Sequence, residues 1–169
     1  EITAAPIKPG VDTAGGVIPA TVGRYTPRPE YARYLQKALG YSLCGLTSEQ
    51  KMFICYGEGG NGKNIVMDLL QRLAPDYVAT AAPALLMVSA RGAEADAPSA
   101  ATASLAGSRM VIASESKAGA RLDTAVIKAH TGNKYMRARF LNGNPFTFEV
   151  THKLWLMTNY RPRIDDLDA

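Results

Sequence analysis

Short apolar segments alternate with segments of helical period along most of the chain. Residues 51–56, 109–116 and 153–159 are nearly continuous apolar runs, which are typical of buried parallel strands. In 30–39, and again in the stretch between Lys63 and Pro75, apolar residues recur every three or four positions, which predicts helices. Because strands alternate with helices, the pattern predicts an α/β domain of three layers with a mainly parallel central sheet.

Further signals complete this prediction. The Asn142-Gly143 pair separates the segments MRARF and PFTFE, and such a pair is a strong signal for a β-hairpin, here inserted before the last strand. Gly40 is expected to end the first helix. Shorter elements are also expected, namely a strand at 77–80, an Ala-rich helix at 98–106 and a helix at 123–130.

The chain divides into three parts on composition. Residues 1–28 are rich in Pro, Gly, Thr and Ala without an apolar period, so we expect an extended arm or linker there. Residues 29–50 are expected to form a helical lead-in, and 51–169 the core of the domain. The whole length of 169 residues is enough for one domain with a substantial core.

Composition narrows the class of protein. Apolar residues make up 47% and charged residues 20%, as in ordinary globular proteins. No apolar run approaches the roughly 20 residues that span a bilayer, and the first residues do not resemble a signal peptide. Cys44 and Cys55 have no metal-binding spacing, and Cys55 is expected to be a small core residue. We therefore expect no membrane partner and a cytoplasmic location.

Positive charge is concentrated in one part of the chain. The net charge of +4 is mild, but between residues 128 and 163 seven cations face a single acid, Glu149. This distribution suits a polyanionic partner, with an ordinary solvated surface as an equally weighted alternative. The cations are Lys128, Lys134, Arg137, Arg139, Lys153, Arg161 and Arg163.

Residues 56–64 read YGEGGNGKN, which is close to the phosphate-binding pattern G-x-x-x-x-G-K-[S/T]. The segment follows a predicted strand and opens a predicted helix, so its backbone N–H groups and the helix N-terminus would surround phosphate groups. Lys63 would reach the β- and γ-phosphates, whereas a merely structural Gly-rich turn would have no need of a lysine. The candidate nucleotide-binding residues are Gly57, Glu58, Gly59, Gly60, Asn61, Gly62, Lys63 and Asn64.

Position 64 departs from the pattern because Asn64 stands where a hydroxyl residue is expected. That hydroxyl normally binds Mg²⁺, and an amide oxygen is also a hard oxygen ligand, although it would place the ion differently. Glu115 ends a predicted strand, where an acid could hold Mg²⁺ or polarise the attacking water, but strand-end acids are also common on surfaces. Asn159 ends the last strand and would orient water if that strand lies beside the phosphate loop.

Four segments in order resemble a known family. YLQKALGYSLCGLTSEQKMFICYGEGGNGKN, RMVIASES, RLDTAVIKAHTGNKYMRARF and FTFEVTHKLWLMTNYRPRI look like the ATPase core of phage and plasmid primase-helicases, which are superfamily 3 helicases related to poxvirus primase-helicases. The resemblance covers roughly residues 31–164. It implies an AAA+-like P-loop NTPase fold, ATP and Mg²⁺ as cofactors, and hexameric rings or related assemblies that move along single-stranded DNA.

The resemblance also implies roles for residues. Lys63, Glu115 and Asn159 become catalytic, and Asn64 and Glu115 become the metal ligands. The segment from Lys128 to Glu149 becomes the DNA-facing element, with Arg137 and Arg139 on one side of a strand and Met136, Ala138 and Phe140 on the other. Its implied DNA-binding residues are Lys128, His130, Lys134, Arg137 and Arg139.

The sequence departs from the family at several places. The family's acidic turn is GNK here, one strand-end acid stands where many relatives carry two, and we expect that the chain lacks the family's C-terminal part with its trans-acting arginine. Arg161 and Arg163 are the candidate replacements for that arginine.

The sequence thus predicts an ATP-dependent DNA helicase-type motor core that works in phage or plasmid replication. The alternative is a truncated module that binds nucleotide and DNA, or assembles, with little or no hydrolysis. A P-loop kinase for a small molecule would leave the hairpin and the basic segment unexplained.

Overall fold

The computed structural model describes residues 29–57, 62–88, 99–114 and 118–164. The predicted arm at 1–28 lies outside the described residues, and the division into three parts stays a prediction. The elements are α2 (Pro29–Leu43), β1 (Met52–Tyr56), α3 (Lys63–Leu73), β2 (Val78–Ala81), the 3₁₀ helix η1 (Pro83–Leu86), α4 (Ala100–Ala103), β3 (Met110–Ser114), α5 (Thr124–Gly132), β4 (Tyr135–Ala138), β5 (Phe146–Glu149) and β6 (Lys153–Thr158).

Four strands form a parallel sheet in the order β1-β6-β3-β2. The last strand of the chain, β6, lies between the first and the third, with Cys55 of β1 beside Met157 and Ser114 of β3 beside the same residue. The carboxyl ends of β1, β6 and β3 therefore stand next to one another at one edge of the sheet. All six residues of β6 are buried, as expected for the centre of a parallel sheet covered on both faces.

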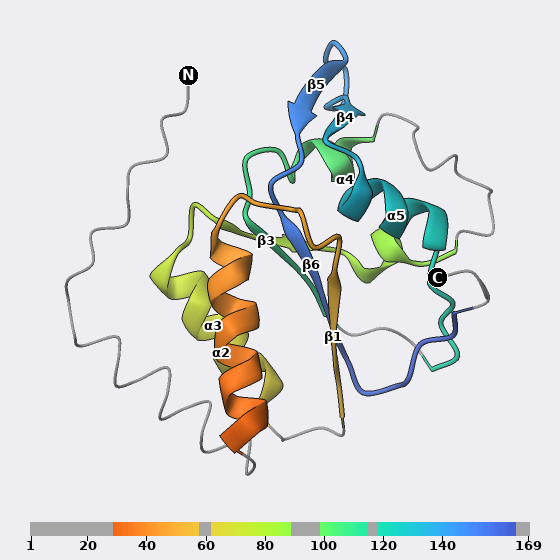
Figure 1. Cartoon of the computed structure of the whole chain (residues 1–169). Helices are drawn as coiled ribbons and strands as arrows, with labels where there is room; N and C mark the ends of the chain where they lie inside the picture. Colours follow the sequence, from red (N-terminus) through yellow and green to blue (C-terminus); the bar gives the residue numbers. More distant parts are fainter. Residues whose placement is uncertain (1–28, 58–61, 89–98, 115–117, 165–169) are drawn as a thin grey trace.

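Helices cover both faces of this sheet (Figure 1). On one face α2 and α3 pack on the strands through a cluster centred on Leu39, Leu70 and Trp155. On the other face η1 and the segments around α4 and α5 contribute to a cluster that includes Leu86, Leu105 and Leu156. The structure thus confirms the predicted mixed α/β fold of three layers with a mainly parallel sheet.

The C-terminal end of α2 is attached to the amino end of β6. The Trp155 indole Nε1 donates a hydrogen bond to Ser42 Oγ at 2.8 Å, and Lys153 Nζ donates to the Cys44 carbonyl oxygen. These contacts and the buried Leu39 extend the helix to Leu43, so the prediction that Gly40 ends it is wrong. A helix end that packs against a sheet outweighs the small cost of a glycine within the helix.

The predicted hairpin is present as the antiparallel pair β4–β5, attached between α5 and β6. Its base packs through Ala129, Met136 and Val150. The connection is longer than a two-residue loop, because β4 ends at Ala138 and β5 begins at Phe146, and within it the Gly143 N–H donates to the Phe140 carbonyl oxygen at 3.0 Å. Asn142, with φ +59°, is therefore the third residue of the turn, whereas the sequence pattern favoured Asn142 and Gly143 as its two central residues.

Helices that could cross a bilayer are not found among the described residues: none is both long enough and apolar enough.

Candidate functional site

Lys63 is the first residue of α3, directly after β1 and the glycine-rich segment. Gly62 precedes the helix with φ +82°, a left-handed conformation that glycine adopts readily. Lys63 Nζ donates a hydrogen bond to the Gly57 carbonyl oxygen, and the Gly57 N–H donates to the Thr158 carbonyl oxygen at 3.2 Å. The two ends of the predicted phosphate loop thus meet beside the end of β6. Glu58, Gly59, Gly60 and Asn61 lie outside the described residues.

A small cavity of about 50 Å³ opens at the carboxyl edge of the sheet, where β6 lies between the other two strands. Helix α3, strand β3 and strand β6 each contribute to its wall. The structure therefore brings together Lys63, Asn64 and Asn159, three residues that the sequence placed in one site. Glu115, the fourth, lies outside the described residues. The lining residues are Lys63, Asn64, Ser114, Met157, Thr158 and Asn159.

Besides Met157, sequence reasoning missed the two hydroxyl residues of this cavity, Ser114 and Thr158. The only local signal for them was that each is the last residue of an apolar strand. Thr158 is 2% exposed, and its hydroxyl donates to the Tyr160 carbonyl oxygen at 2.8 Å and accepts from the Tyr160 N–H at 3.0 Å. This local pair of hydrogen bonds fixes the direction in which the chain leaves β6, and hence the position of the exposed Asn159.

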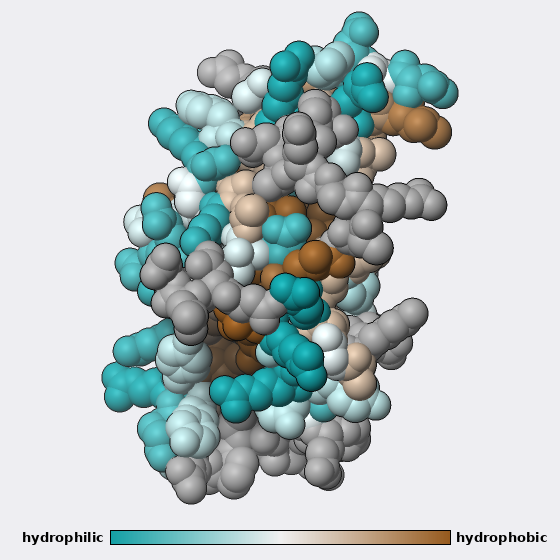
Figure 2. All heavy atoms as spheres, turned by 90° about the vertical axis from the view of Figure 1, so that its right-hand side faces the viewer, coloured by the Kyte–Doolittle hydropathy of each residue, from teal (hydrophilic) through white to brown (hydrophobic). Residues whose placement is uncertain are grey.

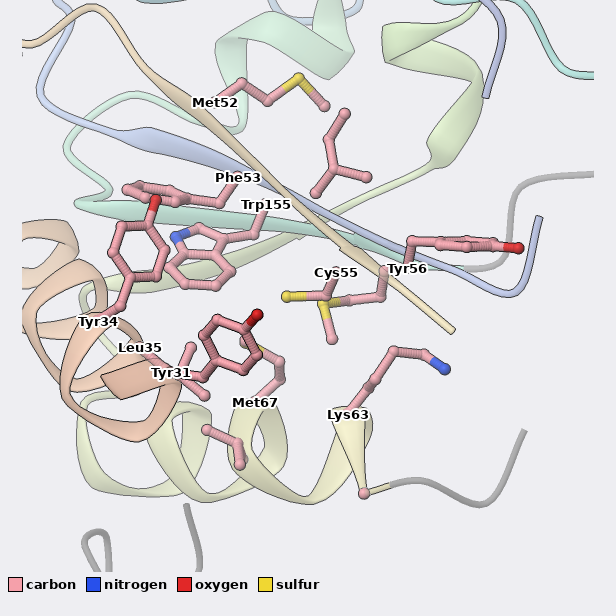
Figure 3. Close-up of a pocket in the computed structure, with 14 residues that line it drawn as sticks. Tyr31, Tyr34, Leu35, Met52, Phe53, Cys55, Tyr56, Lys63, Met67 and Trp155 are labelled. Atoms are coloured by element: carbon pink, nitrogen blue, oxygen red, sulfur yellow. The ribbon is translucent and has the colours of Figure 1, made fainter. Parts of the chain in front are cut away.

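A larger cavity of about 570 Å³ shares Gly62 and Lys63 with the predicted phosphate loop. Figure 3 shows Tyr31 and Tyr34 of α2 on one side of it, with Phe53 and Trp155 of the sheet opposite and Lys63 toward one end. Phe53 and Trp155 stack with ring centroids 4.4 Å apart. The volume of the larger cavity is in the range of small-molecule sites. The sequence identified Tyr31 and Tyr34 only as members of an apolar helix face.

Cys55 is half-buried: it packs against the core cluster under α2 and α3, as expected, and it also forms part of the wall of this larger cavity. Burial raises the pKa of its thiol to about 11, although the nearby Lys63 charge acts in the opposite direction. The thiol is therefore protonated at neutral pH, and it contributes a small, neutral side chain to the cavity.

The hairpin presents exposed cations, as expected. Arg137 and Arg139 are exposed on one side of the β4 segment, whereas Met136 and Ala138 are buried on the other. Phe140 differs from the expectation, since it is 52% exposed beyond the end of the strand. Figure 2 shows mainly hydrophilic side chains at the end of the molecule that carries the hairpin.

Two further cations of the basic segment are also exposed. Lys134 stands at the hairpin base with Nζ 5.3 Å from the centre of the exposed Tyr135 ring, and Lys128 is exposed on α5. Lys153 is different, because it is only 2% exposed and lies with Nζ 4.7 Å from the centre of the Tyr41 ring. Burial lowers the pKa of its ammonium group. Lys153 therefore stabilises the fold and is not part of the exposed basic surface.

His130 is a correction to the predicted DNA-binding set. Its side chain is 1% exposed, and its Nδ1 lies 3.0 Å from His152 Nε2, with one ring donating and the other accepting a hydrogen bond. Burial lowers the pKa of His130 to about 4, so the ring is neutral at pH 7. A buried, neutral ring does not contact a DNA backbone, and this residue packs α5 against the start of β6.

Arg161 and Arg163, the candidate trans-acting arginines, are both exposed. The main chain of Arg163 is fixed to the segment before α5: its N–H donates to the Ala120 carbonyl oxygen and its carbonyl oxygen accepts from the Leu122 N–H, each at 2.9 Å. The chain after β6 is thus held along the surface with both guanidinium groups toward solvent. Their role between subunits stays a prediction.

A family model described as "Family of unknown function (DUF5906)" matches residues 55–169. A protein of Acanthamoeba polyphaga mimivirus named "Putative helicase L207/L206" is 28% identical over 142 residues, which are 84% of this chain and 15% of that protein. This chain therefore spans only a small part of that relative.

Two solved structures have a similar fold. The A form apo structure of the NrS-1 C-terminal region has a TM-score of 0.62 at 11% identity, over 90% of this chain and 34% of that one. A second apo structure of the NrS-1 C-terminal region has a TM-score of 0.59 at 14% identity, over 90% of this chain and 36% of that one. At these identities the likeness shows a shared fold, and this chain spans about a third of the solved chains.

Proposed function

The chain belongs to DUF5906, a family of unknown function, and we propose that it is the ATP-hydrolysing core of a helicase-type motor that acts on single-stranded DNA during replication. The observation that carries the proposal is the place of β6 between β1 and β3, which gathers Lys63, Asn64 and Asn159 around one cavity. In open α/β sheets, ligands bind at such carboxyl edges. The name of the mimivirus relative supports the helicase part of the proposal.

The larger cavity gives this proposal a place for the rest of the nucleotide. It extends from Lys63 to the aromatic side chains of Tyr34 and Phe53, so a base could lie between rings while its phosphates reach the loop. Aromatic and apolar walls with few polar groups are typical of cofactor sites. The motif and the cavity thus favour a nucleoside triphosphate over a free phosphate.

The donor set of the small cavity suits Mg²⁺, because Asn64 and Ser114 offer neutral oxygen atoms of the kind this ion binds. When bound, Mg²⁺ would neutralise charge on the phosphate oxygens during transfer. Lys63 would bind the β- and γ-phosphates, and Asn159 would orient the attacking water, with Glu115 as the proposed residue that accepts its proton. An arginine from a neighbouring subunit, Arg161 or Arg163, would stabilise the charge that develops.

The hairpin would be the DNA-facing element. Lys134, Arg137 and Arg139 are exposed at one end of the molecule, where they can neutralise successive phosphates without reading sequence. The proposal includes a ring-shaped homo-oligomer, since a neighbouring subunit would both complete the catalytic site and place several hairpins around one strand of DNA.

Single-turnover ATP hydrolysis with and without single-stranded DNA tests the proposal. We expect hydrolysis that DNA accelerates, and a loss of about 10²- to 10³-fold in Lys63→Ala, as for removal of one group that stabilises charge in a transition state. Lys51→Ala, an exposed lysine before β1, is the matched control and should keep the wild-type rate. A rate that is unaltered in Lys63→Ala would exclude the proposal.

A second candidate function is a module that binds nucleotide and DNA without hydrolysis. The observation in its favour is Asn64 at the position of the expected hydroxyl. The same experiment separates the two, because ATP binding without DNA-stimulated hydrolysis would support the module, whereas any DNA-stimulated rate that depends on Lys63 would exclude it.

A further inference from the structure

Ser114 is the last residue of β3, and the strand's alternation decides which way its side chain faces. Met110 and Ile112 belong to the cluster under α2 and α3, whereas Val111 and Ala113 belong to the cluster on the opposite face. Because successive side chains of a strand point to opposite faces, Ser114 is on the face of Met110 and Ile112. This is the face covered by α3, the helix that begins with Lys63 and Asn64.

The small cavity places the Ser114 side chain beside the first turn of α3. Ser114 lines this cavity together with Lys63 and Asn64, and it is half-buried where the four preceding residues of β3 are fully buried. The strand therefore ends with a hydroxyl group at the point where it leaves the core. This hydroxyl reaches the cavity from a strand, whereas the usual phosphate-loop hydroxyl would reach it from the helix.

The other hydroxyl of the cavity is already engaged. Thr158 Oγ1 both donates to and accepts from the main chain of Tyr160, so its proton and one lone pair are used within the turn. Thr158 is also only 2% exposed. Among the described residues that line the cavity, Ser114 is consequently the hydroxyl suited to a ligand.

We propose that Ser114 supplies the hydroxyl ligand of the nucleotide-bound Mg²⁺, in place of the hydroxyl that position 64 lacks. The inference rests on the proposed function, since the ion would arrive with the nucleotide. Mg²⁺ takes oxygen ligands and keeps several waters beside the phosphates, and in phosphate-loop proteins one of its ligands is a neutral Ser or Thr hydroxyl. Asn64 and Ser114 would each provide one ligand, from α3 and β3.

The affinity for a fluorescent, non-hydrolysable ATP analogue, measured while MgCl₂ is titrated, tests this assignment without any turnover. In wild type, Mg²⁺ should tighten binding. In Ser114→Ala, the affinity without metal should be unchanged, and the half-saturating Mg²⁺ concentration should rise by about 10- to 100-fold, the usual cost of damage to a metal site. Ser104→Ala, which removes a hydroxyl from the exposed end of α4, is the matched control and should behave as wild type.

A second variant distinguishes a ligand from a merely structural residue. In Ser114→Cys, Mg²⁺ should increase the affinity for the ATP analogue as little as in Ser114→Ala. Cd²⁺ is a softer ion that accepts thiolate ligands, so it should restore the metal-dependent gain in affinity. Wild type in Cd²⁺ gives the baseline, since Cys44 and Cys55 are present in both proteins.

The outcomes separate this inference from the function it rests on. A Ser114→Ala protein with the wild-type Mg²⁺ dependence would overturn the assignment while leaving nucleotide binding intact. A wild-type protein that binds no ATP analogue at any Mg²⁺ concentration would overturn the proposed function, and the assignment with it.

Discussion

The two ends of β6 lie in different surroundings, although one strand of six residues joins them. At the amino end, His152 and Lys153 are each 2% exposed; His152 Nε2 meets His130 of α5, and Lys153 Nζ donates to the Cys44 carbonyl oxygen after α2. At the carboxyl end, Asn159 is exposed beside a cavity. Polar side chains at the first end complete the fold, whereas Asn159 beyond the second end is available to a ligand.

The contrast shows that residue type alone does not identify a site. Lys153 and Arg139 belong to the same basic segment, and both counted toward a polyanion partner, yet one is under a helix and the other is on a hairpin surface. An exposed cation is a candidate DNA contact, whereas a buried one serves as a hydrogen-bond donor to main-chain carbonyl oxygens. Changes of pH and substitutions at both ends of β6 and on the hairpin test this division.

Lowering the pH should destabilise the protein through the histidine pair at the amino end of β6. Burial lowers the pKa of His130 to about 4 and that of His152 to about 3, with the charges of His130 and Lys153 adding to the effect on His152. The unfolded chain therefore binds protons first, so stability is complete above pH 6.5 and falls as pH falls toward 4. Each histidine that the unfolded chain protonates first contributes a slope of up to about 1.4 kcal/mol per pH unit within that window.

Urea unfolding at pH 6.5 and pH 5 measures this slope in a range where carboxylates contribute little. His130→Phe should flatten it, because the pair then has one ionisable ring fewer. An equal slope in the variant would show that the buried pair does not cause the acid sensitivity.

Lys153→Met should lower the free energy of unfolding by about 2 kcal/mol, since the carbonyl oxygens of Cys44 and Thr151 lose a donor. Denaturant titration measures the change. Lys51→Met, an exposed lysine before β1, should change stability by no more than about 0.5 kcal/mol. If Lys153→Met kept wild-type stability and weakened DNA binding, the division of the basic segment would be wrong.

Thr158→Val keeps the shape of the side chain but removes the hydroxyl that fixes Tyr160. We expect kcat for ATP hydrolysis to fall about 10-fold with KM within about two-fold, because a misdirected Asn159 affects the attacking water more than ground-state binding. Thr158→Ser should restore most of the rate. A serine variant as slow as the valine variant would contradict the positioning role.

The smallest effect is expected at the hairpin. Replacing Arg137 and Arg139 by alanine should weaken single-stranded DNA binding and reduce the slope of log affinity against log salt by about 1.4, or 0.7 for each lost phosphate contact. Fluorescence anisotropy at several salt concentrations measures the slope. Arg33→Ala with Arg72→Ala removes the same charge from exposed positions on α2 and α3 and should leave the slope unchanged.

Much of the fold could be predicted because its signals are local. The apolar run before the glycine-rich segment became β1, and the run at 153–159 became β6, which ends one residue earlier than predicted. The prediction for Gly40 failed because contacts distant in sequence, from Trp155 and Lys153, hold the end of α2. Local propensity gives the elements, and tertiary contacts correct their ends.

Less of the candidate site could be predicted. Lys63 was identified from its motif, and Asn159 only on the condition that its strand lies beside the loop, a condition that the sheet order meets. Ser114 was not identified at all, because a serine at the end of an apolar strand has no distinctive pattern. His130 was assigned to DNA binding because it lies in a basic segment. The sequence pattern did not reveal that its side chain is buried, and in the structure it packs α5 against the start of β6.

Local patterns were enough to predict the main strands and helices, the hairpin and the phosphate-binding motif, because apolar period, turn residues and glycine content act over a few neighbouring residues. Tertiary packing placed the last strand in the middle of the sheet and brought Lys63, Ser114 and Asn159 around one cavity. Strand order requires both faces of a sheet to be packed at once, so it depends on residues far apart in the chain. The same packing decided which cations are on the surface and which are in the core.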